Sequence, residues 1–505
     1  DISRSFSARV IGRLREVRGM HGGAIDTVLF VHGYSVTDLR SFNQLPALLA
    51  ADGIRAESIY LAGFVSLDDL VSCDDLAFAL EHRVATLEAG YGLDLSRTIL
   101  IAHSTGAIIA RRWILDRRNA KKANPALPTL SHFMSCAGAN HGSSMAQLGL
   151  TELAHVYRTV AEHKAVGKRV LEDLDYGSAF LTKLNRQWLD AWNDPAEPLF
   201  ADTFCFSMGG TDHSYWQNHL FWQSHESGSD GTVRICGANL NYRWITILPE
   251  PAPYRLETLC QPAPHLVIED GSKRYSHTSQ SAHDTSKLVV GAAHAITEVV
   301  HGFGNDPDPV SLASYGIVEG VHDRAERPYV AFQEAMAVQS TTDYARLAAE
   351  WAGETEAWSA ANPHETNSTI VITIADESKR VVDNSLVLLR DTGGSIASVS
   401  RSIHRNQPIR NQVTPSIVSL YVNFPTFEEA HPHSIHLNAH TSAQHLTCDT
   451  SIDDHHVIGA NEFTYIDVEI PRDPSDAFAF YRMSDPAFDA VLQQQFPPFD
   501  PRGRI

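Results

Sequence analysis

The chain has 505 residues, 43% of them hydrophobic, and a formal net charge of −20. This length exceeds what a single compact core organises, so we expect two or more domains, and the apolar content is that of a folded globular protein. The negative charge argues against nucleic acid as a partner and gives no attraction to anionic membrane surfaces.

No apolar run reaches the roughly 18 residues that a membrane-spanning helix needs. The first residue is Asp1, so the sequence leaves open whether a signal peptide was removed and whether the protein is cytoplasmic or secreted. Six cysteines are scattered without close pairs, mostly in apolar, strand-like runs. We therefore expect buried thiols rather than a disulfide framework or a metal site.

From about residue 24 to residue 303 the chain alternates between strand-like and helix-like runs. This alternation predicts an α/β fold with a doubly wound, mostly parallel sheet that carries helices on both faces. Short buried strands are predicted at 27–31, 58–61, 98–101, 130–136, 203–208 and 266–268. Helices are predicted at 76–87, 107–113 and 288–300.

The predicted strand at 98–101 runs directly into the sequence Ala-His-Ser-Thr-Gly at 102–106, and a helix-like run follows at once. A strand, a tight turn of small residues and a helix form the elbow that holds a nucleophilic serine with its hydroxyl exposed. A neutral hydroxyl is a weak nucleophile, so Ser104 needs a base to take its proton and a third group to orient that base. The sequence therefore predicts that Ser104 is the nucleophile of a serine hydrolase.

A second loop, His32-Gly33-Tyr34, follows the predicted strand at 27–31. Its glycine lets the backbone approach a substrate closely. We expect the backbone N–H groups of Tyr34 and Thr105 to donate to the oxyanion that forms when Ser104 attacks. His32 and His103 are expected to pack or hydrogen-bond within these loops rather than to act as the base.

Three motifs, at 30–34, 102–106 and 138–143, together resemble those of the α/β-hydrolase lipases and phospholipase-like esterases. The elbow begins with alanine instead of the usual glycine. The third motif reads Gly-Ala-Asn-His-Gly-Ser, so Asn140 stands where the family commonly has proline. The likeness covers residues 24–303, and it implies a doubly wound fold and a catalytic triad in the chain order Ser, Asp, His.

Two aspartates compete for the orienting acid. Asp230 lies in Gly-Ser-Asp-Gly-Thr-Val, which resembles the Asp-Gly-x-Val segment of lipases, and we favour it. Asp212 directly follows the strand at 203–208, where the fold usually places the acid. An Asx turn explains either residue equally simply, because aspartate is common in turns with glycine.

The base is expected between the acid and the last helix, which leaves three histidines. His265 precedes the predicted strand at 266–268 and is disfavoured. His277 lies in Tyr-Ser-His-Thr-Ser, which resembles the His-Ser/Thr-Gly loop of lipases, and it is our first choice. His283 lies almost at the start of the helix at 288–300 and remains the alternative.

Residues 144–198 carry apolar side chains at helical spacing, which predicts a helical insertion. Such an insertion above the C-terminal ends of the strands suits a lid or substrate-binding cap, and ordinary packing helices explain the pattern as well. We assign 1–304 to a hydrolase domain and 305–362 to a linker with an exposed or bridging helix at 341–358.

Residues 363–505 are predicted to form a β-sandwich-like domain. Alternating runs separated by Pro, Asn and Asp suit an antiparallel sandwich. Its strands are predicted at 368–374, 385–389, 416–422, 463–470 and 478–481. We expect this domain either to stabilise the hydrolase by packing or to bind membrane, carbohydrate or a protein partner.

No cofactor is predicted. The sequence holds no Walker A motif and no Gly-x-Gly-x-x-Gly after a strand, and triad hydrolysis needs neither metal nor nucleotide. A tail cluster of histidines includes His436 and His440 at i, i+4 spacing, but its surroundings read as strand and loop, so a metal site is not expected. The other members of the cluster are His431, His433, His445, His455 and His456.

The sequence thus predicts a serine carboxylic-ester hydrolase with Ser104, His277 and Asp230 as its triad. The resemblance favours lipid esters as substrates, as for a lipase or phospholipase A, met at a membrane or micelle surface. The same machinery serves thioesterases, polyester depolymerases, amidases and short-chain esterases. A catalytically silent α/β-hydrolase scaffold used for binding is the alternative from another class.

Overall fold

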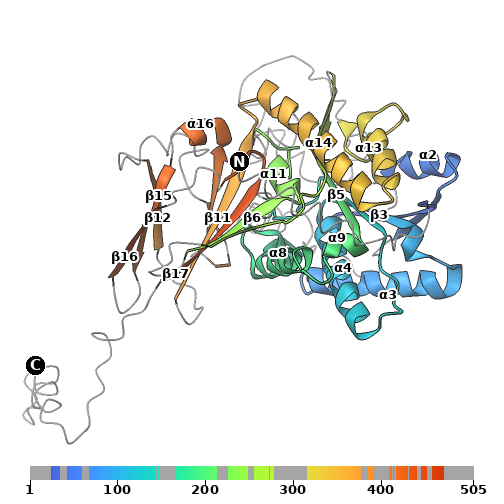
Figure 1. Ribbon diagram of the computed structural model, residues 1–505, viewed down its shortest axis with the longest axis horizontal. Helices are drawn as coiled ribbons and strands as arrows, with labels where there is room; N and C mark the ends of the chain where they lie inside the picture. The colour runs from blue at the N-terminus through green and yellow to red at the C-terminus, as the bar shows by residue number, and fades with distance from the viewer. Residues whose placement is uncertain are drawn as a thin grey trace, which may run out of the picture.

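Two large sheets organise the molecule, and each draws strands from distant parts of the chain (Figure 1). The computed structural model describes residues 24–34, 42–59, 68–143, 146, 167–212, 226–247, 255–271, 273–277, 315–376, 385–391, 409–411, 413–414, 417–429, 432–440, 445–451 and 458–470.

The larger sheet has eight strands in the order β10-β9-β8-β5-β4-β3-β1-β2. Neighbouring strands are parallel except β8 and β9, which form an antiparallel pair. The central strands are buried throughout, because helices cover both faces and every side chain meets protein. The strand bounds are β1 (Thr27–Val31), β2 (Arg55–Ile59), β3 (Thr98–His103), β4 (His132–Cys136), β5 (Phe204–Gly210), β8 (His265–Asp270), β9 (Lys273–Ser276) and β10 (Tyr315–Gly316).

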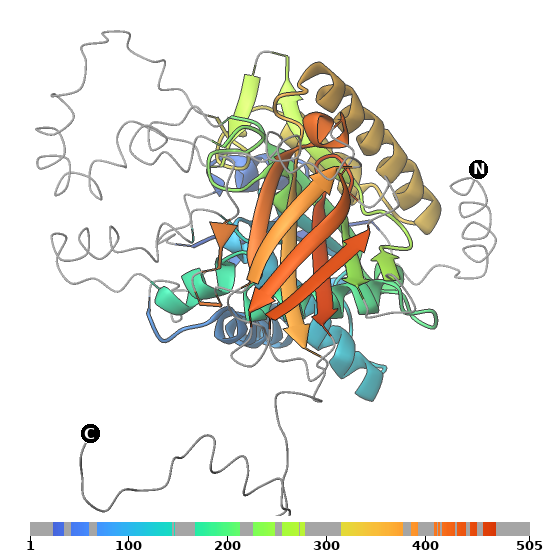
Figure 2. The same ribbon diagram turned by 90° about the vertical axis from the view of Figure 1, so that its left-hand side faces the viewer.

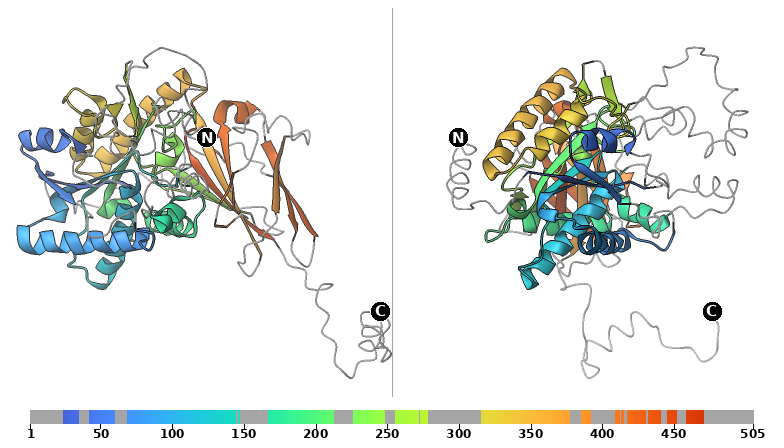
Figure 3. Two further views of the ribbon diagram at one scale, coloured as in Figure 1. Left: turned by 180° about the vertical axis from the view of Figure 1, so that it is seen from behind. Right: turned by 90° about the vertical axis from the view of Figure 1, so that its right-hand side faces the viewer.

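Helices lie on both sides of this sheet, as Figures 1 and 3 show. One side carries α3 (Cys73–Tyr91), α4 (Thr105–Ala123) and α8 (Ala179–Trp192), and the other carries α13 (Arg327–Met336) and α14 (Thr341–Ala361). Shorter helices are α2 (Leu45–Ala51), η2 (Leu95–Arg97), α7 (Lys168–Leu174), α9 (Leu199–Asp202) and α11 (Ile235–Ala238). The predicted doubly wound α/β architecture is therefore present.

Helix α14 covers the sheet, although the sequence favours an exposed or bridging helix here. Its buried side chains Tyr344, Leu347 and Trp351 recur along one face, and the Tyr344 hydroxyl donates a hydrogen bond to the carbonyl of Cys205 in β5 (2.6 Å). The sequence pattern of a mostly exposed helix with a few buried aromatic residues is that of a bridging helix. The pattern does not show on which surface those aromatic residues pack.

The helical insertion is described only from residue 167 onward. Helix α8 packs on α4 through the buried residues Leu184 and Trp188, and Arg111 of α4 donates to the side-chain oxygen of Asn185 (2.8 Å). This part of the insertion is a packing layer. Residues 147–166, and the predicted helix at 288–300, lie outside the described residues.

The second sheet has six strands in the order β13-β14-β11-β17-β6-β7. Its strands are β13 (Ile409–Arg410), β14 (Val418–Asn423), β11 (Asn367–Asp376), β17 (Phe463–Ile470), β6 (Tyr242–Ile247) and β7 (Arg255–Thr258). The pairs β11–β17 and β17–β6 are parallel and the others antiparallel, so the sheet is mixed rather than antiparallel as expected. The reason is that β17 pairs in parallel with both of its neighbours, β11 and the strand β6, which comes from before residue 304.

A three-stranded antiparallel sheet accompanies it in the C-terminal part. It consists of β12 (Ser385–Asp391), β15 (Pro432–His440) and β16 (His445–Ser451), and the short helix α16 (Phe424–Glu429) precedes β15. Figures 1 and 3 show it beside the six-stranded sheet, on the side away from the eight-stranded one, and Figure 2 views these strands with the eight-stranded sheet behind them. The predicted strand at 478–481 lies outside the described residues.

One buried core runs from the eight-stranded sheet into the six-stranded sheet. Phe463 and Tyr465 of β17 belong to the same apolar cluster as the strands around Ser104. The aromatic ring of Phe463 stacks on His141 with ring centroids 4.5 Å apart. The C-terminal sheet is thus packed against the third sequence motif. In the described part of the chain, no helix is both long and apolar enough to cross a membrane.

Candidate active site

Ser104 lies at the junction of β3 and α4 with a backbone φ of 57° and ψ of −128°. A positive φ at a residue with a side chain is strained, and such strain persists where the surroundings impose it. Here the Ser104 N–H donates to the carbonyl of Cys136 (3.1 Å) and its carbonyl accepts from Ala107 (3.0 Å). His103 and Thr105 are buried, whereas Ser104 is only partly buried. This is the conformation that turns a serine hydroxyl outward at the end of a strand.

Two glycines fit tightly around this elbow. A Cβ on Gly106 would lie 2.6 Å from the carbonyl oxygen of His32 and 2.7 Å from that of Val31. A Cβ on Gly33 would lie 2.7 Å from the Cβ of Ser104. The loop after β1 therefore lies directly against the nucleophile, because neither glycine carries a side chain.

This contact places the loop that leads to Tyr34 against the turn that leads to Thr105, the two predicted oxyanion donors. Tyr34 follows Gly33, and Thr105 is the first residue of the 19-residue helix α4. The N-terminus of a helix carries a partial positive charge, which favours a developing anion there. His32 donates from Nδ1 to the carbonyl of Gly33 (2.9 Å), and burial lowers its pKa, so it serves the loop as a neutral group.

The third motif packs beneath the elbow. Asn140 donates from Nδ2 to the Ser135 hydroxyl (3.0 Å) and to the carbonyl of Ala238 (2.8 Å). His141 bonds through Nε2 to the carbonyl of Asn239 (2.9 Å), and burial holds its pKa well below the usual value. Asn140, which replaces the family's proline, thus connects β4 to the segment that follows the Asp230 loop.

Asp230 lies in a turn that its own side chain closes. Its Oδ1 accepts hydrogen bonds from the backbone N–H groups of Thr232 (3.0 Å) and Val233 (2.8 Å). This is the Asx-turn geometry expected of aspartate before glycine, and it leaves Oδ2 free to face another group. Gly210, at the end of β5, permits the approach, since a Cβ there would lie 3.2 Å from the Cβ of Asp230.

His277 meets that second oxygen. Its Nδ1 lies 3.0 Å from Oδ2 of Asp230, and its backbone N–H donates to the carbonyl of Asp230 (3.0 Å). The acceptor is a carboxylate, so Nδ1 carries the proton and Nε2 is the ring nitrogen that accepts. The two side chains are 9% and 1% exposed, which keeps water from competing for their hydrogen bond.

His103 connects this pair to the elbow. Its Nε2 donates to the carbonyl of His277 (2.9 Å), and the two imidazole rings lie 4.7 Å apart. Burial, together with the nearby His277, lowers the pKa of His103 to about 3, so the ring is neutral. The residue before the nucleophile therefore holds the loop of the predicted base.

The alternatives lie elsewhere or outside the described chain. The backbone N–H of Asp212 donates to the carbonyl of Tyr275 (2.9 Å), while the carboxylate that accepts from the His277 ring is that of Asp230. His265 bonds the hydroxyl of Ser207 within the sheet (2.9 Å). His283 lies outside the described residues. The structure thus brings together the first choices for acid and base.

Our reading of the sequence missed a buried ion pair beside the acid. Arg234 donates from Nε and Nη2 to the two carboxylate oxygens of Glu226 (2.8 and 2.9 Å), at the two ends of the Asp230 turn. These side chains are 1% and 7% exposed. The one available signal is an arginine within the otherwise apolar stretch 233–238, which is unusual unless the charge is paired.

The part of the chain that the structure describes holds no cluster of His, Cys, Asp and Glu suited to a metal ion. His436 and His440 lie on the strand β15 and not on a helix, and His431, His455 and His456 lie outside the described residues. Cys73, Cys136, Cys205 and Cys236 are buried free thiols, and Cys260 is a partly buried one.

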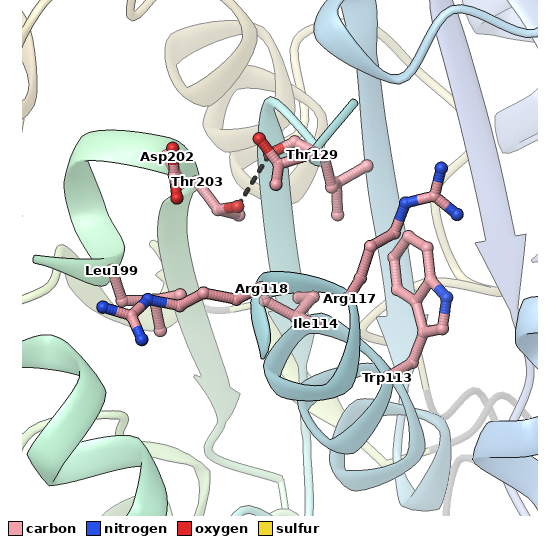
Figure 4. A pocket seen from close by; sticks show the side chains of 9 residues that line it. Trp113, Ile114, Arg117, Arg118, Thr129, Leu199, Asp202 and Thr203 are labelled. Atoms are coloured by element: carbon pink, nitrogen blue, oxygen red, sulfur yellow. Dashed lines mark hydrogen bonds between the residues drawn. The ribbon is translucent and has the colours of Figure 1, made fainter. Parts of the chain in front are cut away.

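A small pocket lies far from this site (Figure 4). Trp113 and Arg118 of α4 line it, and they follow Ser104 by nine and fourteen residues, or about 14 to 21 Å along a helix. Figure 4 shows the two arginines of α4 extending away from each other across the helix. The other lining residues are Ile114, Arg117, Thr129, Leu130, Leu199, Asp202 and Thr203. We assign this pocket no part in the chemistry at Ser104.

No protein-family model and no curated protein matches the sequence. Among solved structures, the chain is similar to phospholipase PlaB from Legionella pneumophila, with 21% identity and a TM-score of 0.70 over 92% of this chain and 97% of that one. A second structure of PlaB, in complex with thio-NAD, gives 20% identity and a TM-score of 0.68 over 91% and 97%. Identities this low bear on the fold alone. The chain has the α/β-hydrolase fold, and its likeness to these structures extends through the C-terminal sheets.

Proposed function

We propose that the protein is a serine hydrolase of carboxylic esters, with Ser104 as nucleophile, His277 as base and Asp230 as orienting acid. One observation supports this most strongly: the hydrogen-bonded Asp230–His277 pair is held by His103, which directly precedes the strained Ser104. A packing role explains neither the strain at Ser104 nor a buried aspartate–histidine pair beside it.

Acylation follows from this arrangement. The Ser104 Oγ attacks the ester carbonyl carbon while Nε2 of His277 takes its proton, and Asp230 stabilises the imidazolium that results. The carbonyl oxygen becomes an oxyanion, to which the backbone N–H groups of Tyr34 and Thr105 donate. The intermediate collapses as His277 returns the proton to the departing alcohol, which leaves an acyl group on Ser104.

Deacylation repeats the chemistry with water as nucleophile. His277 takes a proton from the water, the oxyanion forms again at the same donors, and the acid leaves as the proton returns to Ser104. Every step uses side chains and backbone groups of this chain.

Lipid esters, as for a lipase or phospholipase A, are the substrate class that we propose. The two PlaB structures, described as a phospholipase, share the fold over nearly the whole chain, including the second sheet. The charge of −20 makes a zwitterionic lipid surface a better partner than an anionic one. Short-chain esters, thioesters and polyesters are the competing substrates, because a fold and a triad do not select among them.

The test compares p-nitrophenyl esters of increasing acyl length with phosphatidylcholine vesicles. We expect activity to rise with acyl length and to extend to vesicles, and Ser104→Ala to lose all of it. Ser96→Ala is the matched control, since Ser96 lies before the other end of β3 and its hydroxyl bonds Asp94. Activity confined to short soluble esters would refute the lipid proposal, and activity that survives in Ser104→Ala would refute the nucleophile.

A further inference from the structure

The loop that carries Asp230 is held by strands from the far end of the chain. We define residues 226–234 as the acid loop. The Glu226–Arg234 ion pair closes it at its ends, and Asp230 donates from its backbone N–H to the carbonyl of Val233 (3.1 Å). These bonds give the loop its shape, but they do not attach it to anything else.

The first attachment comes from β14 and the start of β11. The Tyr421 hydroxyl donates to the carbonyl of Ser227, which also accepts from Nδ2 of Asn367 (2.7 Å). Gly228 has a φ of 75°, and a Cβ there would lie 2.5 Å from Nδ2 of Asn367. The C-terminal sheet therefore contacts the loop backbone too closely for any residue except glycine.

The second attachment comes through Arg234. Its guanidinium lies between two aromatic rings, 3.9 Å from the ring centre of Tyr421 and 4.6 Å from that of Tyr176. Its Nη1 donates to the hydroxyl of Thr369 on β11 (3.2 Å). Glu226 accepts from the other two nitrogens, so each nitrogen of this guanidinium donates a hydrogen bond within a buried site.

We propose that Arg234, Thr369 and Tyr421 are positioning residues for the hydrolysis. They fix the acid loop so that Oδ2 of Asp230 meets His277, which makes the C-terminal sheet a structural part of the catalytic centre. The proposal rests on the proposed function. On this proposal the C-terminal sheet is not a separate module that only delivers the hydrolase to its substrate. Its side chains set the geometry of the triad.

We expect an effect on the reaction rate because these residues set where the Asp230 carboxylate lies. Asp230 lies four residues before Arg234 and is tied to Val233, so a displaced Arg234 moves the carboxylate. A displacement of about 1 Å in a catalytic group costs up to about a hundredfold in rate. Thr369 and Tyr421 are buried in the C-terminal sheet, so we expect substrate binding to change little when they are replaced.

The experiment uses the full chain, because β6 pairs with β17 and truncation would expose both sheets. Thr369→Val keeps the shape and removes the acceptor of Arg234, and Thr369→Ser keeps the hydroxyl. Thr464→Val is the matched control: Thr464 is equally buried on the neighbouring strand β17, and its hydroxyl has no hydrogen-bond partner among the described residues. Tyr421→Phe removes the hydroxyl bonds and keeps the ring over Arg234.

Each variant is assayed for kcat and KM on a p-nitrophenyl ester, well below its measured Tm, and for its rate of labelling by a fluorophosphonate. We expect kcat and labelling rate to fall about tenfold in Thr369→Val and Tyr421→Phe with KM nearly unchanged. Thr369→Ser and Thr464→Val should match the parent.

A parent kcat and labelling rate in folded Thr369→Val and Tyr421→Phe would overturn the proposal. An equal loss in Thr464→Val would overturn it too, because the effect would then follow from any change in the sheet. A parent protein that neither labels nor hydrolyses esters would instead refute the proposed function, so the two failures are distinguishable.

Discussion

The two halves of the candidate site are built in different ways. The nucleophile half consists of β1, β3 and the start of α4, where Gly33 and Gly106 let adjacent strands hold Ser104 by contact. The acid and base half consists of loops, in which Asp230 and His277 hold each other while Arg234 and Tyr421 attach the acid loop to another sheet. His103 is the direct connection between the halves.

The geometry of the first half is thus set by neighbouring strands, whereas that of the second half depends on residues far away in the sequence. The strained backbone of Ser104 is enclosed by close contacts with the end of the neighbouring strand β1 and the loop that follows it. The aspartate–histidine pair needs support from residues more than 130 positions later in the chain, such as Thr369. Substitutions of the two glycines that enclose Ser104 should therefore act mainly on folding, and those that loosen the acid loop mainly on turnover.

The largest expected effect tests the second half. Asp230→Asn keeps the shape but lets the amide donate to Nδ1, which favours the wrong tautomer of His277. We expect kcat to fall about 10⁴-fold, as for an orienting acid in a triad, with KM little changed. Asp212→Asn is the matched control and should retain the parent kcat. Loss in Asp212→Asn and not in Asp230→Asn would reverse the assignment of the acid.

A smaller effect tests the first half through stability. Gly106→Ala places a methyl group 2.6 Å from a backbone oxygen that cannot move aside, and we expect a loss of about 3 kcal/mol in the free energy of unfolding. Gly353→Ala lies in the open on α14, where alanine should stabilise the helix by up to about 1 kcal/mol. Urea unfolding measures both. Equal changes in the two variants would show that the elbow is not sterically closed.

His103, which connects the two halves, is expected to make the stability of the protein depend on pH. The folded pKa of His103 is about 3, against 6.5 for an unperturbed histidine, so only the unfolded chain takes up its proton between these values. Stability from this residue is full above pH 6.5 and is lost as pH falls towards 3, by about 2 kcal/mol at pH 5.

His103→Gln removes that titration, so its Tm should fall less than the parent's between pH 7.5 and pH 5. His265→Gln provides the comparison, because burial lowers the pKa of His265 to about 3 as well, away from the triad. We expect the same gain in acid resistance from both variants but a lower kcat only in His103→Gln. A parent-like Tm shift in His103→Gln would contradict the neutral, buried state of this ring.

The strand, turn and helix around Ser104 could be predicted from the sequence because their signals are local. A strand, small residues around a serine and a helix lie within about 16 residues, so the elbow at Ser104 was accessible to pattern alone, and Gly33 was accessible from its own strand and loop. Asp230 and His277 were accessible because each lies in a short turn with its own motif.

The features of the fold and of the site that were not predicted depend on pairing between distant segments of the chain. Nothing in the alternation of β6 indicates that it pairs in parallel with β17, more than 200 residues later, so the mixed sheet was missed. The packing of Arg234 against Tyr421 was missed for the same reason, and α14 covers the sheet through aromatic residues whose partner surface the helix pattern does not reveal.

The most direct test of the account is covalent labelling of the native protein by a fluorophosphonate, followed by mass-spectrometric mapping of the modified peptide. The Ser104 oxygen forms a bond to phosphorus as fluoride leaves, and His277 takes the proton. The account predicts one adduct, on Ser104, that is absent from Ser104→Ala and slowed in Asp230→Asn. The absence of an adduct on the folded parent, or an adduct on another residue, would contradict it.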